Sequence, residues 1–185
     1  VYKRQEEQKE RYLPPMAEGK EIWCQLFSEP SAGSDVAGLR SKAARDGDNW
    51  IINGQKVWTS GAHFSDFGIL VVRHDPNEAK HKGMTFFFVD MKSPGIEVKP
   101  IKQITGGSSF NEVYFTDVEI PDSQRLGEIG DGWKVAITTL MNERLAVGDA
   151  DGADVEDAFR WAKTQDNKGE PIQHNGAARE SIADR

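Results

Sequence analysis

A small-residue turn that follows a short apolar run holds the residues best suited to bind a ligand. Residues 25–35 read Gln-Leu-Phe-Ser-Glu-Pro-Ser-Ala-Gly-Ser-Asp. This pattern predicts a strand that ends near Glu29 and Pro30, and then a turn that presents the amides of Gly33 and Ser34. Converging main-chain N–H groups bind phosphate or carbonyl oxygens, and glycine lets a ligand approach closely. An ordinary β-turn held by local Ser and Asp hydrogen bonds is the alternative interpretation.

A second stretch, residues 53–61, combines a bulky indole with hydroxyl groups near the end of a predicted strand. A planar heteroaromatic ligand could lie against Trp58, with the Ser60 hydroxyl reaching a nitrogen at the ligand's edge. The alternative is a tryptophan buried in the core of a sheet protein. Taken singly, neither stretch decides between a binding site and ordinary structure.

The elements that must position these residues are short β-strands. Between residues 22 and 121 the chain alternates runs rich in Val, Ile, Phe, Trp and Thr with turn residues. Asn53-Gly54 predicts a two-residue hairpin turn. Because no helices intervene, we expect an α+β fold with a central antiparallel β-barrel or sandwich flanked by helices. The predicted strands are Ile22–Ser28, Leu39–Arg45, Trp50–Asn53, Gln55–Ser60, Phe67–Arg73, Met84–Asp90, Ile96–Ile101 and Glu112–Ile120.

Helical patterns lie on both sides of this β region. A polar helix over Lys3–Tyr12 is expected to stop at Pro14 and Pro15, since proline lacks the amide donor. Apolar residues at steps of three and four predict a helix from Gly132 to Val147. Further helices are expected near Val155–Gln165 and over Ala177–Arg185, at the start of a helical bundle that is cut off.

Composition narrows the function classes. The chain has 185 residues, a net charge of −7 and a pI near 5.2, which argues against a nucleic-acid partner. A single cysteine, Cys24, excludes an internal disulfide and favours a reducing, cytoplasmic compartment. No apolar run is long enough to span a membrane, and no secretion signal is recognised. The four histidines have no metal-ligating spacing, so no metal site is expected.

Together, the two stretches resemble the acyl-CoA dehydrogenase family. The resemblance continues through Gly-Met-Thr-Phe-Phe at 83–87, Phe-Asn-Glu-Val-Tyr-Phe-Thr-Asp-Val at 110–118 and Gly-Asp-Gly-Trp-Lys-Val-Ala at 130–136. It implies the end of an N-terminal helical domain at residues 1–21 and a middle β-barrel domain at 22–121. The start of a C-terminal helical domain would occupy 122–185, and the chain would be a piece of a protein about twice as long.

The resemblance implies FAD as the cofactor and acyl-CoA as the substrate. Phe27 and Ser28 would lie against the isoalloxazine edge, Ser60 would approach flavin N5, and Ser34 would also reach the acyl-CoA. The family more often has threonine at the positions of Ser28 and Ser60, and serine keeps the hydroxyl donor. The flavin-binding residues implied are Gln25, Leu26, Phe27, Ser28, Gly33, Ser34, Trp58, Thr59 and Ser60.

The implied reaction is α,β-dehydrogenation, in which a carboxylate removes the α-proton and hydride passes to flavin N5. Glu143 is a candidate base, although a base outside this chain and a solvated helical glutamate are both open alternatives. Arg144 would orient the substrate. Fatty acid β-oxidation, an electron-transfer flavoprotein as acceptor and a dimer or tetramer are further implications. The competing functions are a flavin oxidase or monooxygenase and a non-catalytic β-barrel interaction module.

Overall fold

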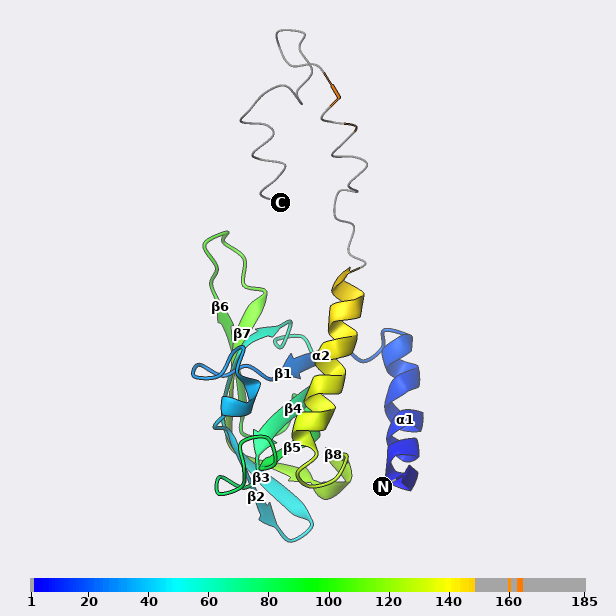
Figure 1. The fold of residues 1–185 in the computed structure, drawn as a ribbon, viewed down its shortest axis with the longest axis vertical. Helices are drawn as coiled ribbons and strands as arrows, with labels where there is room; N and C mark the ends of the chain where they lie inside the picture. Colours follow the sequence, from blue (N-terminus) through cyan, green and yellow to red (C-terminus); the bar gives the residue numbers. More distant parts are fainter. Residues whose placement is uncertain (1, 149–159, 161–162, 165–185) are drawn as a thin grey trace. The chain divides into compact units, whose positions relative to one another are not determined.

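The computed structural model describes residues 2–148, 160 and 163–164. The chain divides into two compact units, Val1–Leu140 and Met141–Arg185, and the first unit holds the whole sheet (Figure 1). The helices predicted at Val155–Gln165 and Ala177–Arg185 lie outside the described residues, apart from residues 160, 163 and 164.

Two helices and eight strands make up the described part. The helix α1 spans Tyr2–Ala17 and α2 spans Gly132–Gly148, and the short 3-10 helices η1 and η2 span Val36–Gly38 and Asp122–Gln124. The strands are β1 (Trp23–Leu26), β2 (Lys42–Asp46), β3 (Asn49–Ser60), β4 (Phe67–Arg73), β5 (Met84–Asp90), β6 (Ile96–Ile101), β7 (Phe110–Pro121) and β8 (Arg125–Leu126).

The strands form one mixed sheet. Their order is β6-β7-β3-β2-β4-β5-β8, and β1 pairs with β4 beside that path. The predicted α+β class is confirmed, but the hydrogen-bonded ladder does not close into a barrel, and two of its pairings, β1 with β4 and β2 with β4, are parallel. The parallel pairings arise because the chain leaves β1 through a long loop and the β2–β3 hairpin before it returns as β4. The edge of β4 is thus shared by β1 and β2.

The predicted hairpin at Asn53-Gly54 is wrong. Both residues lie inside the continuous strand β3, and the tight turn that joins β2 to β3 is at Gly47 and Asp48 instead. Gly47 has a φ of 58°, which suits such a turn. Gly54 is needed for another reason: a Cβ atom there would lie 2.7 Å from the Cα atom of Ser41, so only glycine lets these two segments approach.

An irregularity in the β3–β7 ladder accompanies this close approach. Ile52 faces Val118 and Gly54 faces Phe115, so β7 carries one residue more than β3 over this step. Asp117, in the extra length of β7, has a φ of 49°. This β-bulge therefore bends β7 at a residue type that tolerates the left-handed region.

The prediction that α1 stops before its prolines is also wrong. Pro14 and Pro15 lie inside the helix, which continues to Ala17. Tyr12, two residues before Pro14, packs edge-on against Trp23 and Phe88, with ring centroids 5.1 and 5.2 Å apart. Tertiary packing of this kind outweighs the local cost of the prolines, since most helical stability in proteins comes from an anchored face.

Two buried apolar clusters enclose the central strands. The first contains Trp50 and Phe87, and the second joins Phe27 and Phe86 to Ala136 of α2. Leu70, Val71 and Val72 of β4 are all completely buried, so this strand is covered on both faces. The second cluster is what brings the loop after β1 and the first turns of α2 to the same side of β4 and β5.

Candidate functional site

The two sequence stretches meet in the folded chain. The main-chain N–H of Val57 in β3 donates to the carbonyl oxygen of Ser28 at 2.9 Å. One residue earlier, the Lys56 ammonium donates to the carbonyl oxygen of Phe27 at 3.1 Å. The end of the β1 segment is therefore bonded directly to the part of β3 that precedes Trp58, as the shared-site interpretation requires.

A second bulge determines which side chains face outward. Lys56 faces Val113 and Thr59 faces Asn111, so here β3 carries the extra residue. Trp50, Ile52 and Lys56 are buried with period two, but beyond the bulge the buried positions are Val57 and Thr59. The bulge reverses the alternation of the strand.

Trp58 lies at this reversal. Its φ is 61°, a left-handed conformation that is rare for a large aromatic residue, and its side chain is 59% exposed. The ring of Phe110 meets it edge-on with centroids 6.0 Å apart. The result is an indole and the Ser60 side chain on the outer side, both exposed.

The predicted flavin-binding residues divide by burial. Leu26, Phe27 and Thr59 have buried side chains, so only their main-chain groups could meet a ligand at the surface. Gln25 and Ser28 are half-buried. The exposed members of the predicted set are Gly33, Ser34, Trp58 and Ser60.

The turn after β1 fits an approaching polar ligand. Glu29 and Ala32 exchange two main-chain hydrogen bonds, at 2.8 and 3.0 Å, which close the turn. Immediately after it, Gly33 is exposed, and a Cβ atom there would meet nothing within 4 Å. Exposed hydroxyls, an open glycine and a free indole face suit a planar ring that carries a polyphosphate, so these residues fit FAD.

A buried ion pair behind the site was not predicted from the sequence. Lys56 is fully buried, and its Nζ atom lies 2.7 Å from Oε1 of Glu29, whose side chain is 4% exposed. Burial lowers the pKa of Lys56 to about 8, against the influence of Glu29. Burial raises the pKa of Glu29, but Lys56, the N–H group of Arg40 and the Ser41 side chain outweigh it, so that pKa lies below its usual value. Strand alternation from Trp50 and Ile52 was the signal that could have placed Lys56 inside.

An open pocket of about 560 Å³ adjoins Ser60. The ring of His63 lies with Nδ1 3.2 Å from Oδ1 of Asn111, and the Asn111 amide donates to the carbonyl oxygen of Thr59 at 2.9 Å. The buried Thr59 hydroxyl has no hydrogen-bond partner among the described residues. The pocket is lined by Ser60, Gly61, His63, Phe64, Ser108 and Ser109.

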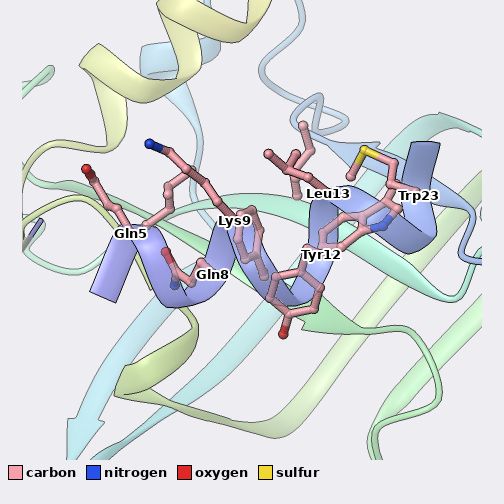
Figure 2. A pocket seen from close by; sticks show the side chains of 10 residues that line it. Gln5, Gln8, Lys9, Tyr12, Leu13 and Trp23 are labelled. Carbon is pink, nitrogen blue, oxygen red and sulfur yellow. The ribbon is translucent and has the colours of Figure 1, made fainter. Parts of the chain in front are cut away.

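A second pocket, of about 320 Å³, lies between α1 and the sheet (Figure 2). Its lining includes Tyr12, Leu13 and Trp23, and it is mostly apolar. Gln8, at its edge, donates through Nε2 to the carbonyl oxygens of Ser123 and Arg125. None of the predicted site residues lines this pocket, so it is separate from the candidate flavin site.

Glu143 and Arg144 are exposed residues of α2. They belong to the second unit, which begins at Met141, whereas the residues of α2 up to Leu140 belong to the first. The predicted helix over Gly132–Val147 is confirmed within one residue. No helix of the described residues is both long enough and apolar enough to cross a membrane.

Comparisons with known proteins agree with this fold. The profile of the acyl-CoA dehydrogenase middle domain matches residues 24–118. Acyl-CoA dehydrogenase FadE34 of Mycobacterium tuberculosis strain H37Rv is 51% identical over 156 residues, which cover 83% of this chain and 22% of that protein. The chain therefore belongs to the acyl-CoA dehydrogenase family, as its sequence motifs predicted.

Solved structures extend the match to nearly the whole chain. The steroid acyl-CoA dehydrogenase Tcur3481-Tcur3483 superimposes with a TM-score of 0.80 at 35% identity, over 96% of this chain and 46% of that one. The prolyl acyl carrier protein oxidase AnaB gives a TM-score of 0.79 at 28% identity, over 96% of this chain and 48% of that one. The chain thus spans less than half the length of these relatives.

Proposed function

We propose that this chain is the flavin-facing middle part of a longer FAD-dependent acyl-CoA dehydrogenase. The observation that carries the proposal is the bulge of β3, which turns Trp58 and Ser60 outward beside the Phe27–Ser28 segment. Gln25, Gly33, Ser34 and the main chain of Leu26, Phe27 and Thr59 complete the proposed flavin contacts. Backbone strain at an exposed tryptophan supports the proposal, because such strain is common at binding sites that are already formed before the ligand binds.

When bound, the flavin supplies the hydride acceptor for α,β-dehydrogenation. In this proposal the Trp58 indole covers one face of the ring and excludes water from it, and the Ser60 hydroxyl donates at its edge. Ser34 contacts the acyl-CoA. Glu143 is the candidate base that takes the α-proton at its carboxylate, and Arg144 orients the substrate.

The test uses the longer protein that contains this chain. We expect flavin absorbance in the purified protein, and anaerobic bleaching by at least one acyl-CoA in a panel that includes straight-chain, branched and steroid-linked thioesters. The steroid member is included because of the similarity to a steroid acyl-CoA dehydrogenase. A protein that binds flavin but is bleached by none of these thioesters would contradict the proposal.

The partners follow from the same proposal. The acceptor of the electrons is an electron-transfer flavoprotein. The longer protein assembles as a homo- or hetero-oligomer, either a dimer or a tetramer. It acts in fatty acid β-oxidation in the cytoplasm. The single cysteine supports a reducing compartment. Burial raises the pKa of its thiol to about 11, which makes Cys24 a poor nucleophile at neutral pH. Sedimentation of the longer protein measures the assembly, and dye reduction with and without the flavoprotein measures the acceptor.

A flavin oxidase is the second candidate, favoured by the similarity to the oxidase AnaB. Oxygen separates the two functions: consumption of O2 at the rate of turnover supports an oxidase or monooxygenase, and electron transfer only to a flavoprotein or dye supports a dehydrogenase.

The third candidate function is an interaction module without catalysis. Ultracentrifugation of the 185-residue chain with added flavin distinguishes it from part of a flavin enzyme. We expect weak flavin binding and self-association, because helices beyond this chain complete the flavin site in the proposal. Tight stoichiometric FAD binding by these residues alone would refute this expectation.

A further inference from the structure

Lys56 joins three segments of the chain around one buried ammonium group. Its Nζ atom contacts Glu29 Oε1 at 2.7 Å and the Phe27 carbonyl oxygen at 3.1 Å. The Glu29 carboxylate in turn accepts hydrogen bonds from the main-chain N–H groups of Arg40 and Ser41, at 2.6 and 3.1 Å. The end of the β1 segment, the two residues before β2 and strand β3 are therefore tied to a single ion pair.

Stability alone does not explain this ion pair. Moving two charges out of water costs several kcal/mol per ion, and replacing a buried pair by well-packed neutral groups is often neutral or stabilising. The ladders and the first apolar cluster, which contains Trp50 and Ile52, already hold β3 in the sheet. What the ion pair adds is the position of one peptide group, Phe27–Ser28, relative to the bulge at Trp58.

The bond to Phe27 also has an electronic effect on the opposite side of that peptide. In a trans peptide the N–H points away from the C=O, so the Ser28 N–H points away from the buried ammonium. A cation at the carbonyl oxygen polarises the peptide and makes its N–H a stronger donor. A ring edge that gains electrons in front of Ser28 is therefore stabilised.

We infer that Lys56 is a positioning residue of the flavin site: its ammonium, held by Glu29, fixes and polarises the Phe27–Ser28 peptide beside the Val57–Trp58 bulge, and so favours the reduced ring. This inference rests on the proposed function. Lys56 itself lies behind the main chain, fully buried, and touches neither substrate nor cofactor.

The test compares three forms of the longer protein: the parent, the double variant Glu29→Gln/Lys56→Met, and Lys92→Met as the matched control. The double variant removes both charges without leaving one buried alone, and the glutamine keeps an acceptor for Arg40 and Ser41. The control removes a lysine from an ion pair of similar length, 2.8 Å, that is exposed. The readouts are the reduction potential and absorption spectrum of the bound flavin, together with hydrogen exchange at the Val57 amide.

For the double variant we expect a folded protein in which the oxidised flavin is favoured about tenfold more than in the parent, about 30 mV for a two-electron couple. The Val57 amide should exchange faster, because its acceptor, Ser28, is no longer held. The control should match the parent in all three readouts. A fourth form, Lys56→Arg, keeps a cation at this position and should retain most of the parent potential.

A double variant with the parent's flavin potential, spectrum and Val57 exchange overturns the inference and leaves the proposed function intact. A double variant that does not fold also overturns it, because the ion pair would then be needed for the fold itself. A parent protein that binds no flavin overturns the proposed function, and the inference with it.

Discussion

The β3–β7 ladder is interrupted by two bulges that look alike in backbone geometry and differ in what holds them. One contains Asp117, with a φ of 49°, and the other contains Trp58, with a φ of 61°. These are the two residues other than glycine with positive φ in the described part of the chain. They sit on opposite strands of the same pair, several residues apart.

The bulge at Asp117 is explained by its own contacts. Aspartate is a residue type that tolerates the left-handed region. Its N–H donates to Asn53 Oδ1 at 3.0 Å, and its carboxylate accepts from Asn53 Nδ2 at 2.9 Å. This pair of bonds satisfies the irregular backbone locally, so the Asp117 bulge belongs to the architecture of the sheet.

The bulge at Trp58 has no such local explanation. A large aromatic residue is strained at positive φ. Because the ring of Trp58 is mostly exposed, its burial offsets little of that strain. The difference supports the proposal that the first bulge serves the fold and the second serves the flavin site. Substitutions at each bulge or its support therefore separate effects on folding from effects on flavin binding.

The largest effect is expected at Gly54→Ala, beside the Asp117 bulge. The added Cβ would collide with the main chain of Ser41, 2.7 Å from its Cα atom, at a φ of 150°. We expect a loss of about 3 kcal/mol in the free energy of unfolding, measured by urea denaturation. In Gly107→Ala, the control, the new Cβ meets only atoms 3.7 Å or more away, so equal losses in the two variants would contradict the packing argument.

Gly54 also shows what sequence reasoning captured and what it missed. Alternation and β-propensity located seven of the eight observed strands, because they report local burial. Asn53-Gly54 has the composition of a hairpin turn, but the glycine is needed because Ser41, on another segment of the sheet, packs closely against it. No local sequence pattern contains this tertiary contact. The prediction that the prolines end α1 was wrong for the same reason, since Tyr12 anchors that helix through tertiary packing.

The sequence predicted part of the candidate site, as it predicted part of the fold. Family motifs named Gly33, Ser34, Trp58 and Ser60 as flavin contacts, and all four are exposed in the structure, so the contacts stay a prediction that flavin binding can test. They did not reveal that Lys56 is buried, or that a bulge reverses the strand beyond it. The alternation of Trp50 and Ile52 could have placed Lys56 inside, but the bulge depends on the pairing of β3 with β7, which a single strand's sequence does not encode.

A moderate effect is expected at Asn53→Ala, which removes both side-chain bonds to Asp117. Because the pair is exposed, we expect a loss of about 1 kcal/mol in the free energy of unfolding. Flavin binding by the longer protein should remain unchanged. Asn77→Ala is the control, since this exposed asparagine is bonded through its main-chain N–H. A weaker flavin affinity in Asn53→Ala alone would show that the first bulge also supports the site.

The smallest effect on stability, and the clearest on binding, is expected at Trp58→Asn. Asparagine tolerates the left-handed region, and an exposed indole contributes little packing, so the free energy of unfolding should stay within about 0.5 kcal/mol of the parent or rise slightly. Flavin affinity of the longer protein should fall at least about tenfold, the equivalent of one lost stacking contact of about 1.4 kcal/mol.

Asp117→Ala is the matched variant at the other bulge, and the reverse pattern is expected there: reduced stability and unchanged flavin affinity. Stability is followed by urea denaturation and affinity by flavin titration of the apoprotein. If Trp58→Asn destabilised the chain as much as Asp117→Ala, the strain at Trp58 would be supporting the fold. The strained conformation would then need no ligand to explain it, and the division between a structural and a functional bulge would fail.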